Sequence, residues 1–442
     1  MTAIAFPGTL AQQTIAKQLE EARARTFLLL SPLSDHDLRI QHDPLMSPIL
    51  WDLGHIAHFE ELWLTRNLDG PIEFVEMPGL YNPFEHPRSE RGSLALPELE
   101  HCRKVMEDIR ARVLERLAVA DFDGSSLLLR EGYVYRMVLQ HEYQHNETML
   151  QTLQLKQGSP YVPATRFDTP SLLPDAHAAA PGDMVRFPGG QVEIGTDDRS
   201  QAYDNERRRH HVWLAPFWID RYPVTNGEFA RFIAAGGYSA REHWSDAGWA
   251  WLQDSGVSAP KYWRQVAGEW VTRSMDRVAP VNSMHPVCHV CFYEAEAYAR
   301  FAGKRLPTEV EWEAAASWDP QAGTKRTYPW GEGPVTKDRA NVDQLSFGTA
   351  PVLSYRSNFS PIGCYGMIGD VWEWTSSNFG PYPGFESFPY REYSEVFFGG
   401  EYKVLRGGSW ATRPGAIRNP FRNWDYPIRR QIFSGFRCAR DA

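Results

Sequence analysis

The stretch LEHCRKVMEDIRARVLERL, residues 99–117, decides the fold class of the first part of the chain. Its apolar residues recur at steps of three and four, which places them on one face of an α-helix. The residues on that face are Leu99, Cys102, Met106, Ile109, Val113 and Leu117. Similar periodicity extends from residue 8 to residue 155, so we predict a helical bundle, in which such faces bury one another. The expected helices span about residues 8–30, 46–66, 97–119 and 126–156.

The composition changes after this predicted bundle. Residues 157–182 are rich in proline and lack periodicity, which is typical of an extended connector. From residue 183 onward the chain holds all but Trp51 and Trp63 of its 16 tryptophans, in short segments interrupted by glycine and proline. This pattern predicts an irregular α+β domain, with short helices at about residues 225–235 and 293–302. The expected domains are therefore residues 1–156 and 183–442, joined by the connector.

Charge and cysteine content limit the possible partners. The formal net charge is -9 and the isoelectric point is about 5.9, which argues against a surface for nucleic acids or anionic membranes. No apolar run approaches the roughly 20 residues that a membrane span needs, and the first residues do not resemble a signal peptide. Five scattered cysteines fit reduced thiols. We expect a cytoplasmic protein that acts on small polar substrates, with its oligomeric state left open.

The sequence HEYQH, residues 141–145, is the first candidate for chemistry. His141 and His145 lie one helical turn apart and could hold one metal ion together, as in zinc proteases, where Glu142 would be the general base. A solvated helix face is the plainer interpretation of such a pair. A third imidazole could come from SPILWDLGHIAHFEELWL, although spacing alone does not choose between His55 and His58. Three neutral imidazoles would leave positions open on iron or zinc.

Longer motifs carry a resemblance to a known family. SPILWDLGHIAHFEELWL together with HEYQHNETMLQ is similar to the DinB-like helical domain of ergothioneine-type sulfoxide synthases, the hercynine oxygenases. The segments YPVTNGEFARFI, GKRLPTEVEWEAAA, GDVWEWTSS and LRGGSWATRPGAIRNPFRNWDYPIRRQIFSGFRCAR resemble the formylglycine-generating-enzyme fold. The two resemblances, in this order, cover nearly the whole chain. They imply a DinB-like four-helix bundle followed by a C-type-lectin-like, sulfatase-modifying-factor domain, with the active site where the two domains meet.

The resemblance also implies an activity. Members of this family use iron(II) and dioxygen to join a cysteine-type sulfur to C2 of the imidazole of hercynine, giving a sulfoxide. Carried over by motif, the iron ligands would be His55, His141 and His145. Glu142 would then have no protease role; it would either lie behind the metal ligands and support them or lie on the surface.

Four residues are implied as contacts of the sulfur donor. YNPFEHPRSERG is similar to the arginine loop of the branch that uses γ-glutamylcysteine, with Arg88 and Arg91 at the arginine positions and two neighbouring positions that differ. FRNWDYPIRRQ adds Asp425 and Arg429. γ-Glutamylcysteine carries two carboxylates and one ammonium, so guanidinium groups and one acid are complementary to it.

The remaining implied contacts are aromatic or polar. FPYREYSEVFFGG aligns with the active-site tyrosine region, so Tyr390 is expected to be the catalytic tyrosine and Tyr393 its neighbour. A phenol stays protonated at neutral pH and can donate a proton. Trp424 and Phe421 could bind the trimethylammonium group of hercynine through their ring faces, and Gln144 could contact the same substrate. Each of these aromatic residues could instead be plain core.

Other functions remain open from sequence. A selenoneine synthase would join hercynine to a selenosugar, which lacks the carboxylates that Arg88 and Arg91 would bind. A zinc protease would need Glu142 and could lose His55. A lectin-like fold can also bind ligands without catalysis. Oxidation of a sulfatase cysteine through copper is disfavoured, because Cys438 matches only one of the two copper-binding cysteines of formylglycine-generating enzymes.

Overall fold

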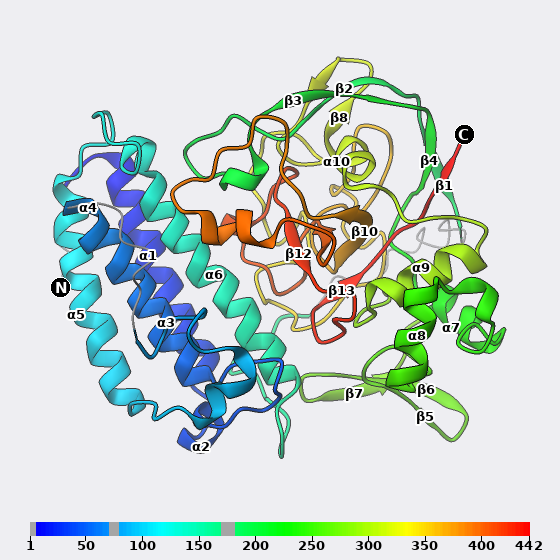
Figure 1. Cartoon of the computed structure of the whole chain (residues 1–442), viewed down its shortest axis with the longest axis horizontal. Coiled ribbons are helices and arrows are strands. Elements are labelled where there is room, and N and C mark those ends of the chain that lie inside the picture. Colours follow the sequence, from blue (N-terminus) through cyan, green and yellow to red (C-terminus); the bar gives the residue numbers. More distant parts are fainter. Residues whose placement is uncertain (1–5, 70–78, 169–181) are drawn as a thin grey trace. The chain divides into compact units, whose positions relative to one another are not determined.

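A computed structural model describes residues 6–69, 79–168 and 182–442 (Figure 1). Part of the predicted connector, residues 169–181, lies outside the described residues. The chain divides into two compact units, which are described separately. The first contains Met1–Ala164 and Asp198–Tyr203, and the second contains Thr165–Asp197 and Asp204–Ala442.

The first unit is built on four long helices that pack side by side (Figure 1). They are α1 (Leu10–Leu30), α3 (Ile49–Glu61), α5 (Leu99–Val119) and α6 (Tyr133–Gln154). Short helical segments connect them: α2 (Asp35–Arg39), η1 (Leu62–Arg66), α4 (Asn67–Asp69), η3 (Arg88–Ser93) and η4 (Arg130–Gly132). Helix α3 packs against both α5 and α6, and α1 also packs against both. The helical bundle predicted from periodicity is therefore present.

The apolar face that identified helix α5 faces the bundle interior. Met106, Val113 and Leu117 have no exposed surface. Burying side chains of this size stabilises a fold by about 1.5–3 kcal/mol each. Leu99, at the start of the helix, is only partly buried because it lies in the first turn.

Local signals explain where these helices begin and end. Helix α1 begins with a capping box, in which Thr9 and Gln12 each bind the backbone of the other. Helix α3 begins after Pro48, later than expected, and continues through the π-helical turn η1 rather than as regular α-helix. Helix α6 begins at Tyr133, later than predicted, because Gly132 adopts a left-handed conformation with φ of 73°. It ends at Gln154, two residues before the predicted end.

The second unit combines small sheets with short helices (Figure 1). One sheet has the strand order β1 (Met184–Phe187), β4 (Phe217–Asp220), β14 (Ala439–Asp441), and another has the order β12 (Asn423–Asp425), β11 (Lys403–Arg406), β10 (Trp372–Asn378), β13 (Ser434–Gly435). A further three-stranded sheet has the order β5 (Trp263–Val266), β6 (Glu269–Ser274), β7 (Arg277–Pro280). Two-stranded sheets are formed by β2 (Gly190–Ile194) with β3 (His210–Leu214) and by β8 (Trp318–Asp319) with β9 (Thr324–Lys325). Strands β10 and β13 are parallel, and the other neighbours are antiparallel.

The helices of this unit include both predicted ones. They are α7 (Asn226–Ala234), α8 (Asp246–Ser255), α9 (Phe292–Phe301) and α10 (Glu309–Ser317), with η6 (Asp204–Glu206), η7 (Arg241–His243), η8 (Arg391–Tyr393), η9 (Glu395–Phe397) and η10 (Pro414–Ala416). Helices α7 and α9 match the predicted ranges 225–235 and 293–302. Helices α8 and α10 were not predicted, because each is short and is held by tertiary contacts rather than by a long apolar stripe.

Buried tryptophans and ion pairs hold this irregular unit together. Trp312 is fully buried, and its indole Nε1 donates to Glu373 at 2.8 Å. The same carboxylate accepts from Arg437 at 2.6 Å. Cys291 and Cys438 are free and fully buried, as expected of cysteines used for packing. Across the described ranges of both units, no helix has the length and apolar character needed to cross a membrane.

Candidate metal centre

Three histidines of the first unit bring their ring nitrogens together. Nitrogen atoms of His55, His141 and His145 all lie within 4.8 Å of one another. The Nε2 atoms of His55 and His141 are 3.2 Å apart. His55 comes from α3, and the other two lie one turn apart on α6, which packs against α3. His58 lies outside this group. The fold therefore favours His55 over His58 as the third imidazole, which spacing alone did not decide.

The outer nitrogens of two of these rings face acceptors in the same unit. His55 Nδ1 lies 2.9 Å from the backbone carbonyl of Tyr81, and because a carbonyl only accepts, Nδ1 must donate. That tautomer leaves Nε2 with its lone pair for a metal. His145 Nδ1 lies 3.3 Å from Asp52 Oδ1, a carboxylate that is 1% exposed. Such outer partners fix ring orientation and raise ligand basicity in metal sites.

A glycine in helix α3 allows Tyr81 to approach. A Cβ atom on Gly54 would lie 2.1 Å from the Tyr81 ring, far inside van der Waals contact. Glycine in a helix interior costs about 0.5–1 kcal/mol relative to alanine. This cost is explained by the position of Tyr81, whose carbonyl orients His55.

Aromatic rings enclose the three imidazoles. Trp51 stacks on His55 with 5.0 Å between ring centroids, and Phe59 stacks on His141 at 3.7 Å. Burial, followed by the nearness of His145, lowers the pKa of His55 well below its ordinary value. Burial also lowers the pKa of His141, with contributions from the other two histidines. Both rings are therefore neutral at neutral pH, which is the form that binds metals.

The arrangement fits a metal ion. Two nitrogens that each lie about 2.1 Å from one ion at an angle of about 100° are about 3.2 Å apart. The Nε2 atoms of His55 and His141 have this separation. Imidazole suits zinc, copper, iron and nickel, so the donor set supports a transition metal without choosing among them. Three protein ligands would leave positions open for substrates.

Glu142 cannot serve as the general base of a zinc protease in this arrangement, and the expectation that it could be a surface residue is wrong. Its side chain is 2% exposed. Glu142 Oε1 accepts from Arg23 Nε at 3.0 Å and from Thr26 Oγ1 at 2.8 Å. The HExxH pattern therefore has a structural glutamate at its second position.

The arginine loop, YNPFEHPRSERG, is partly buried. Arg91 is 5% exposed, donates to the His86 carbonyl and to Ser47 Oγ at 2.8 Å each, and lies 3.6 Å above the Trp51 ring. Burial, with the nearby charge of Arg88, lowers the pKa of Arg91 to about 10, so it stays charged at neutral pH. Arg91 thus holds the loop and Trp51 beside His55, whereas Arg88 is exposed.

Several predicted residues of the second unit lie together. The rings of Tyr390 and Tyr393 are 6.2 Å apart, and Tyr393 meets Trp424 edge to face at 5.8 Å. Asp425 follows Trp424 on β12, and its Oδ1 lies 3.3 Å from Arg429 Nε. Arg429 Nη1 is buried and has no hydrogen-bond partner in the described parts of the chain. A guanidinium nitrogen in this state is suited to an incoming carboxylate.

Phe421 and Gln144 are placed differently. Phe421 is 5% exposed and packs 6.0 Å from the Trp372 ring, which favours the core interpretation. Gln144 is partly exposed on α6, directly before His145.

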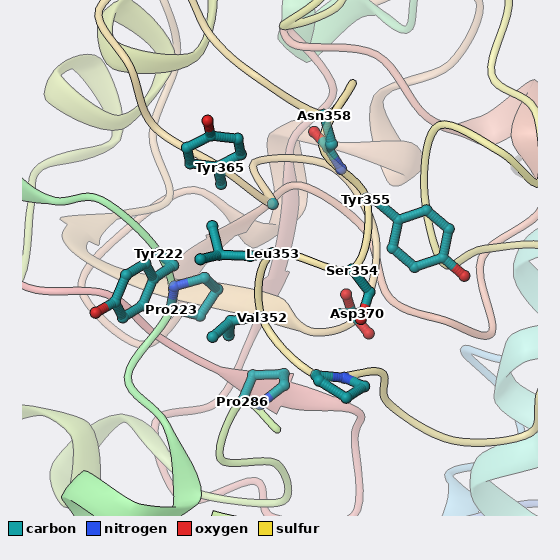
Figure 2. Close-up of a pocket in the computed structure, with 12 residues that line it drawn as sticks. Tyr222, Pro223, Pro286, Val352, Leu353, Ser354, Tyr355, Asn358, Tyr365 and Asp370 are labelled. Carbon is teal, nitrogen blue, oxygen red and sulfur yellow. The ribbon is translucent and has the colours of Figure 1, made fainter. Parts of the chain in front are cut away.

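The second unit also contains a pocket that the sequence did not predict (Figure 2). Its walls include Tyr222, Pro286 and Val352, and it has one carboxylate, Asp370. Burial raises the pKa of Asp370 to about 7. Asp370 Oδ1 accepts from Asn341 Nδ2 and from the Ala350 backbone at 2.7 Å each, so Asp370 braces a loop. None of the predicted site residues lines this pocket.

Sequence reasoning missed the residues that support the histidines. Asp52 lies three residues before His55, and an acid within an apolar helix segment is a signal that could have identified it. The contributions of the Tyr81 carbonyl and of the Trp51 and Phe59 rings depend on how helices pack. No local pattern marks them.

Comparisons with known proteins cover both units. The model of the DinB superfamily matches residues 18–149, and the sulfatase-modifying factor enzyme 1-like domain matches residues 169–442. A hercynine oxygenase from Mycobacterium tuberculosis is 45% identical over 434 residues, which cover 97% of this chain and 99% of that protein. One from Mycolicibacterium smegmatis is 43% identical over 98% of this chain and 100% of that protein. A formylglycine-generating enzyme from Streptomyces coelicolor is 36% identical over 61% of this chain and 92% of that protein. The resemblance and the fold class predicted from the motifs are confirmed.

Proposed function

The chain belongs to the hercynine oxygenase family, and we propose that it is an iron(II)-dependent sulfoxide synthase that joins the thiol of γ-glutamylcysteine to imidazole C2 of hercynine. The observation that carries this proposal is the group of three histidines within a chain that matches hercynine oxygenases along almost its whole length. In the balanced reaction the thiol and the imidazole C–H each lose hydrogen. One atom of dioxygen enters the sulfoxide and the other leaves as water.

The bundle would hold the metal through Nε2 of His55 and through ring nitrogens of His141 and His145. Iron(II), when bound, would supply the redox chemistry that activates dioxygen. The protein residues orient the ligands: the Tyr81 carbonyl fixes the His55 tautomer, and the Asp52 carboxylate faces His145 Nδ1. The aromatic rings of Trp51 and Phe59 limit the access of water to the imidazoles.

The proposed donor contacts are Arg88, Arg91, Asp425 and Arg429. Arg429 has the strongest support, because its buried Nη1 lacks an acceptor among the described residues, and a carboxylate of γ-glutamylcysteine would provide one. Asp425 pairs with Arg429 and carries the negative charge that complements the ammonium group. Arg91 has less capacity for a ligand, since its Nε and Nη1 already donate to the protein.

Hercynine is proposed to contact Trp424, Phe421 and Gln144, and Tyr390 is proposed to donate a proton during the reaction, with Tyr393 beside it. An aromatic face attracts a trimethylammonium group by about 0.5–2 kcal/mol. The Trp424 indole is held rigidly, because Phe379 stacks on it with centroids 4.0 Å apart. Of the two aromatic candidates Trp424 is therefore better suited than Phe421, which packs as core.

The test is product analysis by mass spectrometry. The purified protein is loaded with iron(II) without oxygen, and is then given air, hercynine and a mixture of γ-glutamylcysteine, cysteine and a selenosugar. A γ-glutamylcysteinyl sulfoxide of hercynine is expected. A selenium adduct would overturn the donor assignment in favour of a selenoneine synthase. No adduct with any donor, despite bound iron, would refute the synthase proposal.

A further inference from the structure

Four charged side chains meet inside the helical bundle, one from each long helix. They are Arg23 on α1, Glu60 on α3, Arg110 on α5 and Glu142 on α6. We call this group the buried quartet. The exposed fraction of each residue is between 1% and 8%. Because burying a charge is costly unless it is paired, a group with two charges of each sign needs complete internal pairing.

The pairing within the buried quartet is extensive. Arg23 Nη2 lies 2.6 Å from Glu60 Oε2, and Arg23 Nε lies 3.0 Å from Glu142 Oε1. Arg110 Nε lies 2.6 Å from Glu60 Oε1, and Arg110 Nη2 lies 3.4 Å from Glu142 Oε2. Each carboxylate therefore contacts both guanidinium groups, and each guanidinium contacts both carboxylates.

Further bonds satisfy the remaining donors and acceptors. Arg110 Nη1 donates to the Leu19 carbonyl, and Arg23 Nη1 donates to the Met106 carbonyl at 3.4 Å. Thr26 Oγ1 donates to Glu142 and accepts from Asn146 Nδ2 at 2.9 Å. Both oxygens of Glu142 therefore accept hydrogen bonds inside the bundle.

The pairing geometry fixes how the four helices lie along one another. Ion pairs of this kind are weak evidence for stability, since apolar residues of similar volume often stabilise as well. Their bonds depend on direction and distance, however, and a shift of one helix by one residue, about 1.5 Å along its axis, would break several of them together. Apolar side chains tolerate such shifts more easily because their contacts are not directional.

The metal-bearing helices each contribute a glutamate to the buried quartet. Glu142 directly follows His141, and Glu60 lies about one and a half turns after His55. The Arg23 and Arg110 guanidiniums join these two glutamates. Any shift of α3 against α6 would therefore disturb both the quartet and the separation of the histidines.

We infer that the buried quartet is a positioning element for the metal centre, which sets the register of helices α3 and α6 so that His55, His141 and His145 converge. This inference rests on the metal centre of the proposed function, and it assigns a role to the glutamate of the HEYQH motif. None of the four residues touches the metal or a substrate; each acts through the histidines.

The decisive variant replaces the whole quartet: Arg23→Met, Glu60→Leu, Arg110→Met and Glu142→Leu. Cobalt(II) is titrated into the metal-free full-length protein at a temperature at which circular dichroism shows complete folding. Loss of a residue that orients a metal ligand typically weakens metal binding about 10–100-fold. We expect a decrease of that size and a changed cobalt absorption spectrum, while the melting temperature stays the same or rises. Cobalt affinity and spectrum equal to those of the unchanged protein would overturn the inference.

A conservative variant decides the question if the fourfold variant does not fold. Arg110→Lys keeps the charge but removes the planar fork that bridges Glu60 and Glu142. We expect cobalt binding to weaken about 10-fold in the folded variant. A spectrum and affinity unchanged in Arg110→Lys would equally refute the positioning role.

A matched control comes from another buried polar link in the same bundle. Gln12 Nε2, on α1, donates to the Leu117 carbonyl at the end of α5 at 2.8 Å, and neither helix carries a metal ligand. Gln12→Met should lower the melting temperature and leave cobalt affinity unchanged. An equal loss of cobalt affinity in this control would show a general effect of instability and would count against the inference.

Failure of this inference can be distinguished from failure of the proposed function. If the unchanged protein binds cobalt(II) but forms no hercynine adduct with iron(II), the synthase proposal fails while the quartet can still be judged from cobalt binding. If the unchanged protein forms the hercynine adduct with iron(II) but the fourfold and Arg110→Lys variants bind cobalt(II) as tightly as it does, the inference fails while the synthase proposal stands.

Discussion

The two units differ in the partners of two candidate residues of the bundle, His55 and Arg91, and of one in the second unit, Arg429. In the bundle, His55 Nδ1 donates to the Tyr81 carbonyl, and Arg91 donates to His86 and Ser47. In the second unit, Arg429 Nη1 is buried without a partner among the described residues. The comparison indicates that contacts within the bundle orient His55 before any ligand binds, whereas the proposed donor contact at Arg429 would be completed by the ligand. Changes in the two units should therefore affect different measurements.

The largest effect is expected from a change at the metal centre. His141→Ala removes one of the three proposed ligands and should lower both iron content and activity more than 100-fold, since even changes to residues that support a ligand cost about 10–100-fold. Iron is measured by atomic absorption after dialysis. If His141→Ala retained iron and lost only affinity for the thiol, the assignment of His141 to the metal centre would be contradicted.

A smaller effect with the opposite signature is expected from Arg429→Met. A hydrogen bond to a charged group contributes about 1.5–3 kcal/mol, so the KM for γ-glutamylcysteine should rise about 10–100-fold. Iron content should not change. Steady-state kinetics with each substrate varied in turn separate this effect from one on hercynine. An unchanged KM for the thiol would remove Arg429 from the proposed site.

The variant Gly54→Ala tests whether the close approach of Tyr81 to helix α3 is needed to orient His55. Alanine normally stabilises a helix interior by about 0.5–1 kcal/mol relative to glycine. Here its Cβ would lie 2.1 Å from the Tyr81 ring, so the ring must move, and we expect this to disturb the contact of the Tyr81 carbonyl with His55. We expect weaker iron binding, by about 10-fold, together with a lower melting temperature. The exposed helix position Ala111, changed to glycine, is a control that should lower stability without changing iron binding.

The last test concerns pH and the metal-free protein. The pKa values of His55 and His141 are lowered from an ordinary value of 6.5 in the folded state. Below about pH 6.5 the unfolded chain therefore binds protons that the folded chain does not, and stability falls as pH decreases, by up to about 1.4 kcal/mol per pH unit for each group. Thermal melts between pH 7.5 and pH 5 check this. A His55→Leu, His141→Leu variant should show a smaller decrease, and an equal decrease would contradict the assignment.

Much of the first unit could be predicted from sequence because its signals are local and repeated. Periodic apolar residues located the four long helices, and the spacing of HEYQH placed His141 and His145 on one face. The choice of His55 over His58 required the packing of α3 against α6. In the second unit, short elements held by tertiary contacts give weak local signals, and only helices α7 and α9 were predicted by range.

Two charged residues are buried although their sequence context does not indicate it. Arg91 and Glu142 are charged, and a charged residue in a polar loop or on a helix is normally assigned to the surface. Both are buried because partners that are distant in sequence neutralise or bind them: Ser47 for Arg91, and Arg23 for Glu142. Pairing of this kind is not visible in a single sequence.

The segment Asp198–Tyr203 has a consequence for recombination between related genes. It belongs to the compact first unit although its neighbours in sequence belong to the second, and Gln140 Nε2 on α6 donates to the Gln201 carbonyl at 2.9 Å. A gene fusion at the connector would therefore give the bundle of one parent a segment from the other. Exchange of whole domains is constrained by these six residues, so the two halves are expected to be inherited as one block.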